Sequence, residues 1–170
     1  MMKYEARKIC NFILAHYDAQ EFDLTNLRLN KILYFIHGYS FKQQRAEGLI
    51  RNHFEAWKLG PVIRPVYDTF KVYGEGKIKD LAKYIEYSSG ENRIVPYQDI
   101  DQADAEIILT TFESHARYTT NELVALCHEP GGPWDITFRA WNADQKLSPR
   151  IPDELIRSYF LGDRIKTTLH

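Results

Sequence analysis

Hydrophobic residues recur at helical spacing over most of the chain. Residues 6–17 have apolar positions three and four apart with polar residues between them, which predicts an amphipathic first helix. Residues 29–39 carry too many apolar side chains for a single stripe. This width predicts a second helix, capped by Asp23 or Thr25, that lies nearly buried at the centre of the fold.

Later helices are marked by breakers and caps as well as by spacing. Pro65 suits the first turn of a short helix that ends at Gly74, and residues 101–115 follow the helical template closely. Thr119 and Glu122 have the spacing of a capping box. Two more helices are predicted after Pro133 and after Pro152, the last one stopped by a glycine.

Two stretches do not follow the helical pattern. Residues 53–59 mix aromatic and polar side chains and stop at Gly60 and Pro61, which indicates a short strand or extended arm. Residues 75–99 are less regular: Ile78, Leu81 and Ile85 have a possible helical spacing, followed by an evident loop at residues 88–92. The predicted fold is mainly α: a single compact helical domain over residues 1–170, of about six helices, with a small extended or β element around residues 52–59.

Size, charge and cysteine content narrow the class of protein. A chain of 170 residues with 44% hydrophobic residues buries roughly two-thirds of its unfolded surface without a disulfide or metal. The 22 basic and 23 acidic residues give no cationic excess for nucleic acid. The only two cysteines, Cys10 and Cys127, lie far apart, and apolar runs are far shorter than the roughly 20 residues of a membrane span. We therefore expect a cytoplasmic protein that binds neither membrane nor nucleic acid.

Signatures of cofactor, metal and catalytic chemistry are absent from the sequence. There is no phosphate-binding glycine motif, and no two of the six histidines have the four-residue helical spacing of a shared metal ion. We expect no cofactor, no metal and no enzymatic activity. One alternative stays open: His53 and Glu55 would project from the same face of a strand and could act as an acid–base pair, although the solvated face of an edge strand is the favoured explanation.

Lysine and tryptophan positions raise further questions. Lys31 lies within the most apolar predicted helix, where its charge must reach solvent or a carboxylate. Trp134 and Trp141 share a helical face and are expected in the core, whereas Trp57, next to the Gly60 turn, is the better candidate for an exposed anchor.

Three segments occur in the order of a known family pattern: LNKILYF at residues 29–35, EAWKLGPV at 55–62 and VYDTFKVYG at 66–74. Together with a downstream histidine and tryptophan, they resemble the Panacea antitoxin domain, also called SocA-like or phage-associated GepA-like. The resemblance extends over roughly residues 6–141. The residues that carry the motifs are Lys31, Tyr34, Glu55, Trp57, Gly60, Pro61, Tyr73, Gly74, His128 and Trp134.

The resemblance implies a bacterial or prophage-encoded antitoxin that neutralises a toxin, encoded by the adjacent gene, through direct binding. A similar family member acts instead as an adaptor that delivers its toxin to the ClpXP protease, so the protease is a second implied partner. A homodimer is a third arrangement to consider. The aromatic residues around the Gly60 turn are the predicted toxin contacts, with the loop near residue 87 setting specificity. These contacts are Trp57, Lys58, Tyr67, Tyr73 and Tyr87.

Overall fold

The computed structural model describes residues 3–146 and 149–163 and contains mainly α-helices. In chain order the elements are α1 (Ala6–His16), α2 (Asn26–Lys42), β1 (Phe54–Trp57), β2 (Gly60–Val62), α3 (Arg64–Phe70), the 3-10 helix η1 (Lys71–Tyr73), β3 (Lys83–Ile85), β4 (Asn92–Ile94), α4 (Gln102–Ala116), α5 (Thr120–Cys127), α6 (Pro133–Ala143), β5 (Arg150–Ile151) and α7 (Asp153–Leu161). The predicted fold class is confirmed, with seven α-helices in the described residues where about six are expected.

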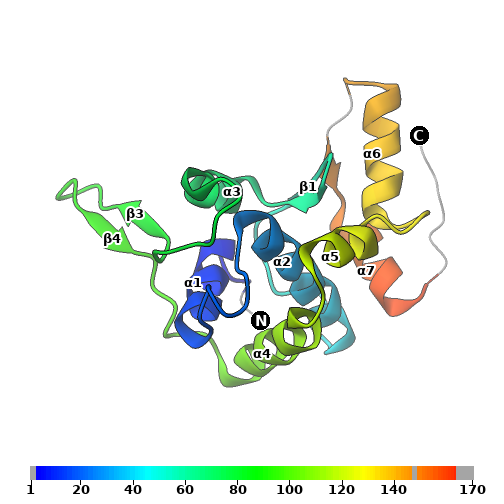
Figure 1. The fold of residues 1–170 in the computed structure, drawn as a ribbon. Helices are drawn as coiled ribbons and strands as arrows, with labels where there is room; N and C mark the ends of the chain where they lie inside the picture. The colour runs from blue at the N-terminus through cyan, green and yellow to red at the C-terminus, as the bar shows by residue number, and fades with distance from the viewer. Residues whose placement is uncertain (1–2, 147–148, 164–170) are drawn as a thin grey trace.

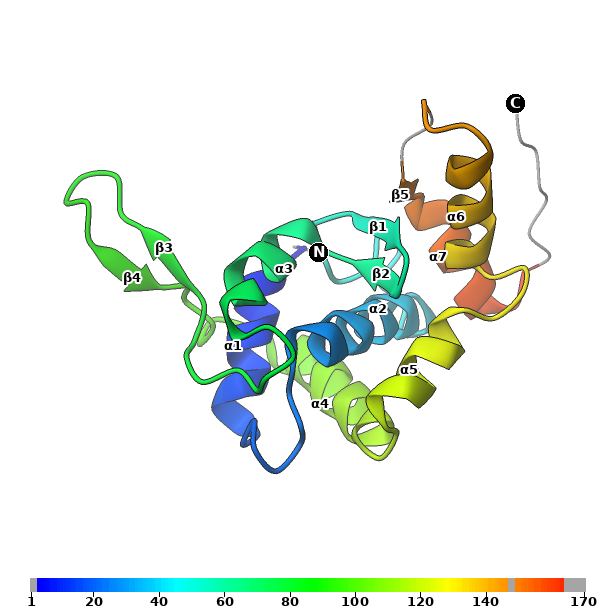
Figure 2. The ribbon, with the colours of Figure 1, turned by 45° about the horizontal axis from the view of Figure 1, so that its top comes forward.

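Helix α2 is the centre of the fold. Fourteen of its seventeen residues are buried, as the width of its apolar pattern predicts. Figure 1 and Figure 2 both show α2 surrounded by other helices, and it packs against α3, α4, α5 and α7. The Thr25 side chain accepts a hydrogen bond from the backbone N–H of Arg28, so the second of the two predicted caps begins this helix.

Helix α7 packs closely on α2 through a glycine. A Cβ atom at Gly38 would lie 2.2 Å from Cε2 of Phe160, so the aromatic ring occupies the space that a larger residue would need. Gly162 ends α7 in the left-handed conformation, with φ of +77°, in agreement with the predicted stop.

A three-stranded antiparallel sheet with strand order β2-β1-β5 covers one side of α2. The sequence predicts that the extended segment stops at Gly60 and Pro61. In the structure these two residues instead begin β2. Proline is tolerated here because Ala56, which faces Pro61, donates its backbone N–H to Pro149 on the other side. The missing N–H of Pro61 therefore costs no ladder bond.

Residues 83–94 form an antiparallel hairpin, not the helix that the spacing of Ile78, Leu81 and Ile85 allows. All six strand residues are exposed. Neither face of the hairpin packs on the core, so the sequence shows no alternation of apolar and polar residues that would have predicted strands. The expected loop at residues 88–92 overlaps the turn of this hairpin. Figure 1 shows β3 and β4 projecting from the body of the molecule.

In the described ranges 3–146 and 149–163, no helix combines the length and apolar character that a membrane crossing requires.

Candidate functional site

Lys31 lies at the centre of the cluster that the motif residues build. Its side chain is fully buried, and Nζ donates a hydrogen bond of 2.7 Å to the backbone oxygen of Pro61. Burial lowers the pKa of the Lys31 ammonium to about 8, because an apolar environment disfavours the charged form. The expectation that Lys31 reaches solvent or a carboxylate is wrong, since its hydrogen bond goes to a backbone carbonyl.

Helix α2 closes the outer edge of β2. Beside the Lys31 bond, Asn30 Oδ1 accepts a hydrogen bond of 2.9 Å from the backbone N–H of Ile63. Pro61 and Ile63 turn their backbone groups away from β1, because hydrogen bonding alternates along an antiparallel strand. Side chains of α2 thus occupy the edge groups that another strand would otherwise use.

Residues 58–59 form the turn between β1 and β2, which we call the β1–β2 turn. An ion pair between Glu55 and Arg64 holds its β1 side. Glu55 accepts hydrogen bonds from Arg64 at 2.7 and 3.1 Å and from Trp57 Nε1 at 2.8 Å. Burial alone would raise the pKa of the Glu55 carboxyl, but these hydrogen bonds outweigh it and the pKa is lowered. The Arg64 guanidinium also lies 5.2 Å from the centre of the Trp57 ring, which fixes the orientation of the indole.

The far side of the turn is held by α6 and the residue after α5. Trp134 Nε1 donates a 2.8 Å hydrogen bond to the backbone oxygen of Trp57, and its ring stacks on His128 at a centroid distance of 3.7 Å. Gly60 has φ of +102°, and a Cβ there would lie 2.9 Å from Cε of Lys31 and 3.4 Å from Nε2 of His128. Glycine is required both by this conformation and by the lack of space.

Most motif residues therefore contact one another inside the protein. Tyr34 is buried against the ring of Phe54. Tyr73 and Gly74 lie apart from this cluster, at the end of η1, where the Tyr73 hydroxyl donates to Asp80 at 2.7 Å. The motif builds and fixes the β1–β2 turn, and the exposed residues of that turn remain free to contact a partner.

A groove with a volume of about 640 Å³ opens beside this turn. We call it the α2–α3 groove. Its apolar wall is formed by half-buried Trp57, buried Val62 and two exposed side chains, Leu59 and Tyr67. Trp57 and Tyr67 meet edge to face with ring centroids 4.8 Å apart. The lining residues are Asp23, Thr25, Asn26, Leu27, Asn30, Trp57, Lys58, Leu59, Val62, Tyr67, Lys71, Gly74, Glu75 and Thr120.

Charged groups border the groove on two sides. Asp23 and Glu75 belong to neighbouring segments, since Thr25 pairs with Lys77 in an antiparallel bridge. Lys58 lies on the β1–β2 turn, which is a separate wall. The groove therefore offers an apolar surface with acidic and basic groups at its border, a composition typical of protein-binding surfaces.

The structure brings three of the five predicted toxin contacts together. Trp57, Lys58 and Tyr67 all line the α2–α3 groove. Tyr73 borders a different, smaller hollow, and Tyr87 lies in the turn of the β3–β4 hairpin, where it is fully exposed.

Leu59 lines the groove but is not among the toxin contacts predicted from the sequence. A large apolar residue in a two-residue turn next to Gly60 is an unusual choice, because polar residues and glycine dominate such turns. This signal was available in the sequence.

The two residues of the alternative acid–base site, His53 and Glu55, are neighbours, but the carboxylate has another partner. His53 Nε2 lies 3.8 Å from Glu55, but that carboxylate is already bound by Arg64. An enzyme site of this kind would also need further groups such as His37 and Asp68, and these lie elsewhere: His37 is buried and accepts from the backbone N–H of Ile50, and Asp68 forms an exposed ion pair with Lys71.

The described residues contain neither a cluster of metal ligands nor a disulfide. Within residues 3–146 and 149–163, no three or more histidine, cysteine or acidic side chains come together in a way that could hold a metal ion. Cys10 and Cys127 are both buried, free thiols.

Comparisons with known proteins give one consistent result. Residues 29–135 match the family model described as antitoxin SocA-like, Panacea domain. The chain is 33% identical over 168 residues to the antitoxin SocA of Caulobacter vibrioides strain NA1000 / CB15N, an alignment that covers 97% of this chain and 87% of the relative. No solved structure matches the chain.

Proposed function

This chain belongs to the family of SocA-like antitoxins with a Panacea domain, and we propose that it neutralises a cognate toxin by binding it directly. The family supports an antitoxin role, and the α2–α3 groove supports binding rather than catalysis. The toxin is the product of the adjacent gene, and the complex forms in the cytoplasm of a bacterial host.

The α2–α3 groove is the core of the proposed interface. Leu59 is 53% exposed and Tyr67 is 37% exposed, and together with Trp57 they present an apolar surface inside a hollow. A few aromatic anchors in such a hollow dominate binding energy in most interfaces. A stable complex buries on the order of 1,600 Å² in total, so the toxin also covers the surrounding surface, including Lys58, Tyr73 and the hairpin that carries Tyr87.

The buried motif residues have a supporting role in this proposal. Lys31, Glu55 and Trp134 hold the β1–β2 turn through hydrogen bonds to Pro61, Arg64 and Trp57. Their loss would move Lys58 and Leu59 rather than remove a toxin contact. Variants of exposed groove residues are therefore the cleaner test of binding.

Neutralisation has two routes that differ in the fate of the toxin. A bound antitoxin blocks the toxin's active site, or it acts as an adaptor that delivers the toxin to the ClpXP protease. In the first route toxin accumulates in an inactive complex, whereas in the second its level falls when this chain is produced. Immunoblots of the toxin in cells with and without the protease distinguish the two.

The first experiment is co-production of this chain with the product of the neighbouring open reading frame. Purification through a tag on this chain, mass spectrometry and sizing should yield a stoichiometric complex with a protein that is toxic when produced alone. A chain that elutes without a partner, beside a harmless neighbour, would refute the proposal and restore interest in His53 and Glu55. Sizing also reports whether two copies of the chain are present.

The second experiment locates the interface with a matched pair of leucines. Leu59 in the groove is 53% exposed and Leu126 on α5 is 42% exposed, so alanine at either position removes a similar apolar surface without disturbing the core. We expect Leu59→Ala and Tyr67→Ala to weaken toxin binding at least tenfold and Leu126→Ala to leave it within twofold. Equal effects at Leu59 and Leu126 would place the interface elsewhere.

A further inference from the structure

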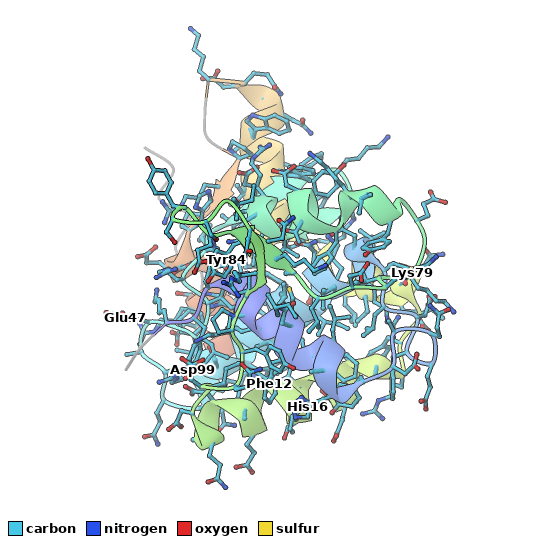
Figure 3. The ribbon with its side chains drawn as sticks, turned by 90° about the vertical axis from the view of Figure 1, so that its left-hand side faces the viewer. Phe12, His16, Glu47, Lys79, Tyr84 and Asp99 are labelled. Carbon is cyan, nitrogen blue, oxygen red and sulfur yellow. The ribbon has the colours of Figure 1, made fainter. Side chains whose placement is uncertain are left out.

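The β3–β4 hairpin is held rigidly at its base and exposed everywhere else. Buried Asn11 on α1 accepts from the backbone N–H of Ala82 at 2.6 Å and donates to the backbone oxygens of Ala82 and Val95 at 3.0 and 2.9 Å. Figure 3 looks at this side of the molecule, with Tyr84 of β3 labelled. An isolated two-stranded hairpin is only marginally stable in water, so this clamp presents a strand pair that has no sheet to join.

Ion pairs gather on one face of the hairpin, and exposed isoleucines on the other. On one face Arg93 forms ion pairs with Glu86 at 3.3 Å and with Glu91 at 3.1 Å. On the other face lie Ile85 and Ile94, which are 71% and 49% exposed, beside their cross-strand partners Asn92 and Lys83. Paired strands normally cover their apolar face with a core or a partner. The isoleucine face of this hairpin is uncovered.

The outer edge of β3 is also open. Val95 donates its backbone N–H to Ala82, and Glu86 donates to Glu91, so these pairs use the hydrogen bonds between the strands. Because bonding alternates along an antiparallel strand, Lys83 and Ile85 turn their backbone N–H and C=O groups outward. These two residues are a template on which another strand can pair.

The contrast with β2 shows that the fold covers one strand edge and leaves another open. At β2, the outward groups of Pro61 and Ile63 are bound by Lys31 and Asn30. At β3 all three residues are exposed. The short length of β3 and its Lys83 limit indiscriminate pairing at an exposed edge, but they leave the outward backbone groups without a bound side chain such as those at β2.

The open edge lies next to the elements that form the groove. A hollow of about 300 Å³ lies between the base of β3 and α3–η1. It is lined by Thr69, Phe70, Tyr73, Asp80, Leu81 and Lys83. The same α3–η1 segment contributes Tyr67 and Lys71 to the α2–α3 groove. A protein that covers α3–η1 therefore reaches both the groove and the edge of β3.

We propose that the cognate toxin adds one of its strands to the outer edge of β3 and packs an apolar side chain against Ile85. This inference rests on the proposed function and identifies a second contact, separate from the groove. A second copy of the chain fits less well, because pairing two strands of three residues buries far less than the 1,200–2,000 Å² of a stable interface. The toxin reaches that area by also occupying the groove.

Amide hydrogen exchange measured by NMR tests the pairing directly. The free protein is compared with its complex with the product of the neighbouring gene. We expect the amides of Lys83 and Ile85 to exchange at least tenfold more slowly in the complex, while those of Asn92 and Ile94 on the opposite edge change little. An intact, neutralised complex without protection at Lys83 and Ile85 would overturn the inference and leave the proposed function standing.

Two further outcomes separate the alternatives. Protection at Lys83 and Ile85 that appears without the toxin and grows with protein concentration would assign the edge to a second copy, and so refute the toxin strand. Failure of the two proteins to form any complex would refute the proposed function together with this inference.

A matched pair of proline variants provides an independent test. Ile85→Pro removes the outward N–H of β3, and Ile94→Pro removes the outward N–H of β4, with loss of an exposed isoleucine in both. We expect at least tenfold weaker toxin binding for Ile85→Pro and less than a threefold change for Ile94→Pro. Equal losses would contradict pairing at β3. The amide exchange of Val95, at the hairpin base, confirms that the hairpin persists in each variant.

Discussion

Single residues that are buried without a charged partner determine the geometry of the β1–β2 turn. Lys31 exchanges the hydration of its ammonium group for one carbonyl hydrogen bond of 2.7 Å, and the cost appears as a pKa lowered to about 8. A buried polar group is retained at such a cost where its hydrogen bond fixes a particular backbone position. Here that position is Pro61, beside the exposed Lys58 and Leu59.

The pH dependence of stability should reveal this buried ammonium. The pKa of Lys31 is about 8 in the folded chain, whereas the ordinary lysine value of 10.5 applies to the unfolded chain. Between these values the unfolded state binds more protons, so folding stability rises with pH. Relative to Lys31→Met, which lacks the titrating group, the wild type should gain at most about 3 kcal/mol from pH 7.5 to pH 10.5. Urea unfolding of both proteins measures this difference, and a gap that is constant with pH would contradict it.

The contact between Gly38 and Phe160 should be intolerant of even one methyl group. Gly38→Ala places a Cβ about 2.2 Å from the Phe160 ring, and overpacking of a core typically costs about 1–3 kcal/mol. Thermal and urea unfolding should show this loss. The double variant Gly38→Ala with Phe160→Leu should recover part of the stability, whereas additive losses would mean that the two residues do not compete for the same space.

At the level of elements, local sequence signals and tertiary contacts contribute differently. Helix α5 begins with the capping box of Thr119 and Glu122, with both reciprocal hydrogen bonds formed, and depends on neighbours within four residues. The β3–β4 hairpin depends instead on Asn11, which is 71 residues away from Ala82. Its strands bury no apolar face of their own.

Removal of the Asn11 amide should loosen the hairpin selectively. Asn11→Ala leaves the N–H of Ala82 and the carbonyl of Val95 without this partner, and unsatisfied buried polar groups cost about 1–3 kcal/mol each. We expect a loss of about 2–4 kcal/mol in unfolding free energy. Amide exchange of residues 83–94 should accelerate more than that of α2. Asn92→Ala, at an exposed hairpin asparagine, is the control and should change stability by less than about 0.5 kcal/mol.

The whole molecule is organised around α2, which joins the N-terminal and C-terminal parts of the chain. Helices α3, α4, α5 and α7 pack against it, and β1 pairs with β5 from the C-terminal part. Figure 2 shows these elements on different sides of the same helix. An arrangement in which most helices share one buried helix favours cooperative unfolding.

Two spectroscopic probes should therefore report the same transition. Tryptophan fluorescence reports on Trp57, Trp134 and Trp141, which belong to β1 and α6, whereas far-ultraviolet circular dichroism reports on all helices. We expect equal midpoints in urea and a single transition in heat. A fluorescence transition at lower denaturant concentration would show that α6 detaches before the α2 core unfolds.

The candidate site could be predicted from sequence only in part. Trp57, Lys58, Tyr67 and Tyr73 are predicted together around the Gly60 turn, and the first three line one groove; their contact with a toxin stays a prediction. Tyr73 and Tyr87 belong to other surfaces. Their separation could not be foreseen, because it depends on how η1 and the β3–β4 hairpin pack against the rest of the fold.

The sequence by itself determined the helices and their caps, because these depend on side chains within about four residues of one another. It also determined the family, because the order of the motifs can be read without the fold. The tertiary structure decided the partner of Lys31, the strand that begins at Gly60, and the open edge of β3. The hydrogen bonds responsible join pairs of residues that are separated by 30, 71 and 77 positions in the sequence. Local periodicity carries no information about such contacts, since they form only when separate elements pack around α2.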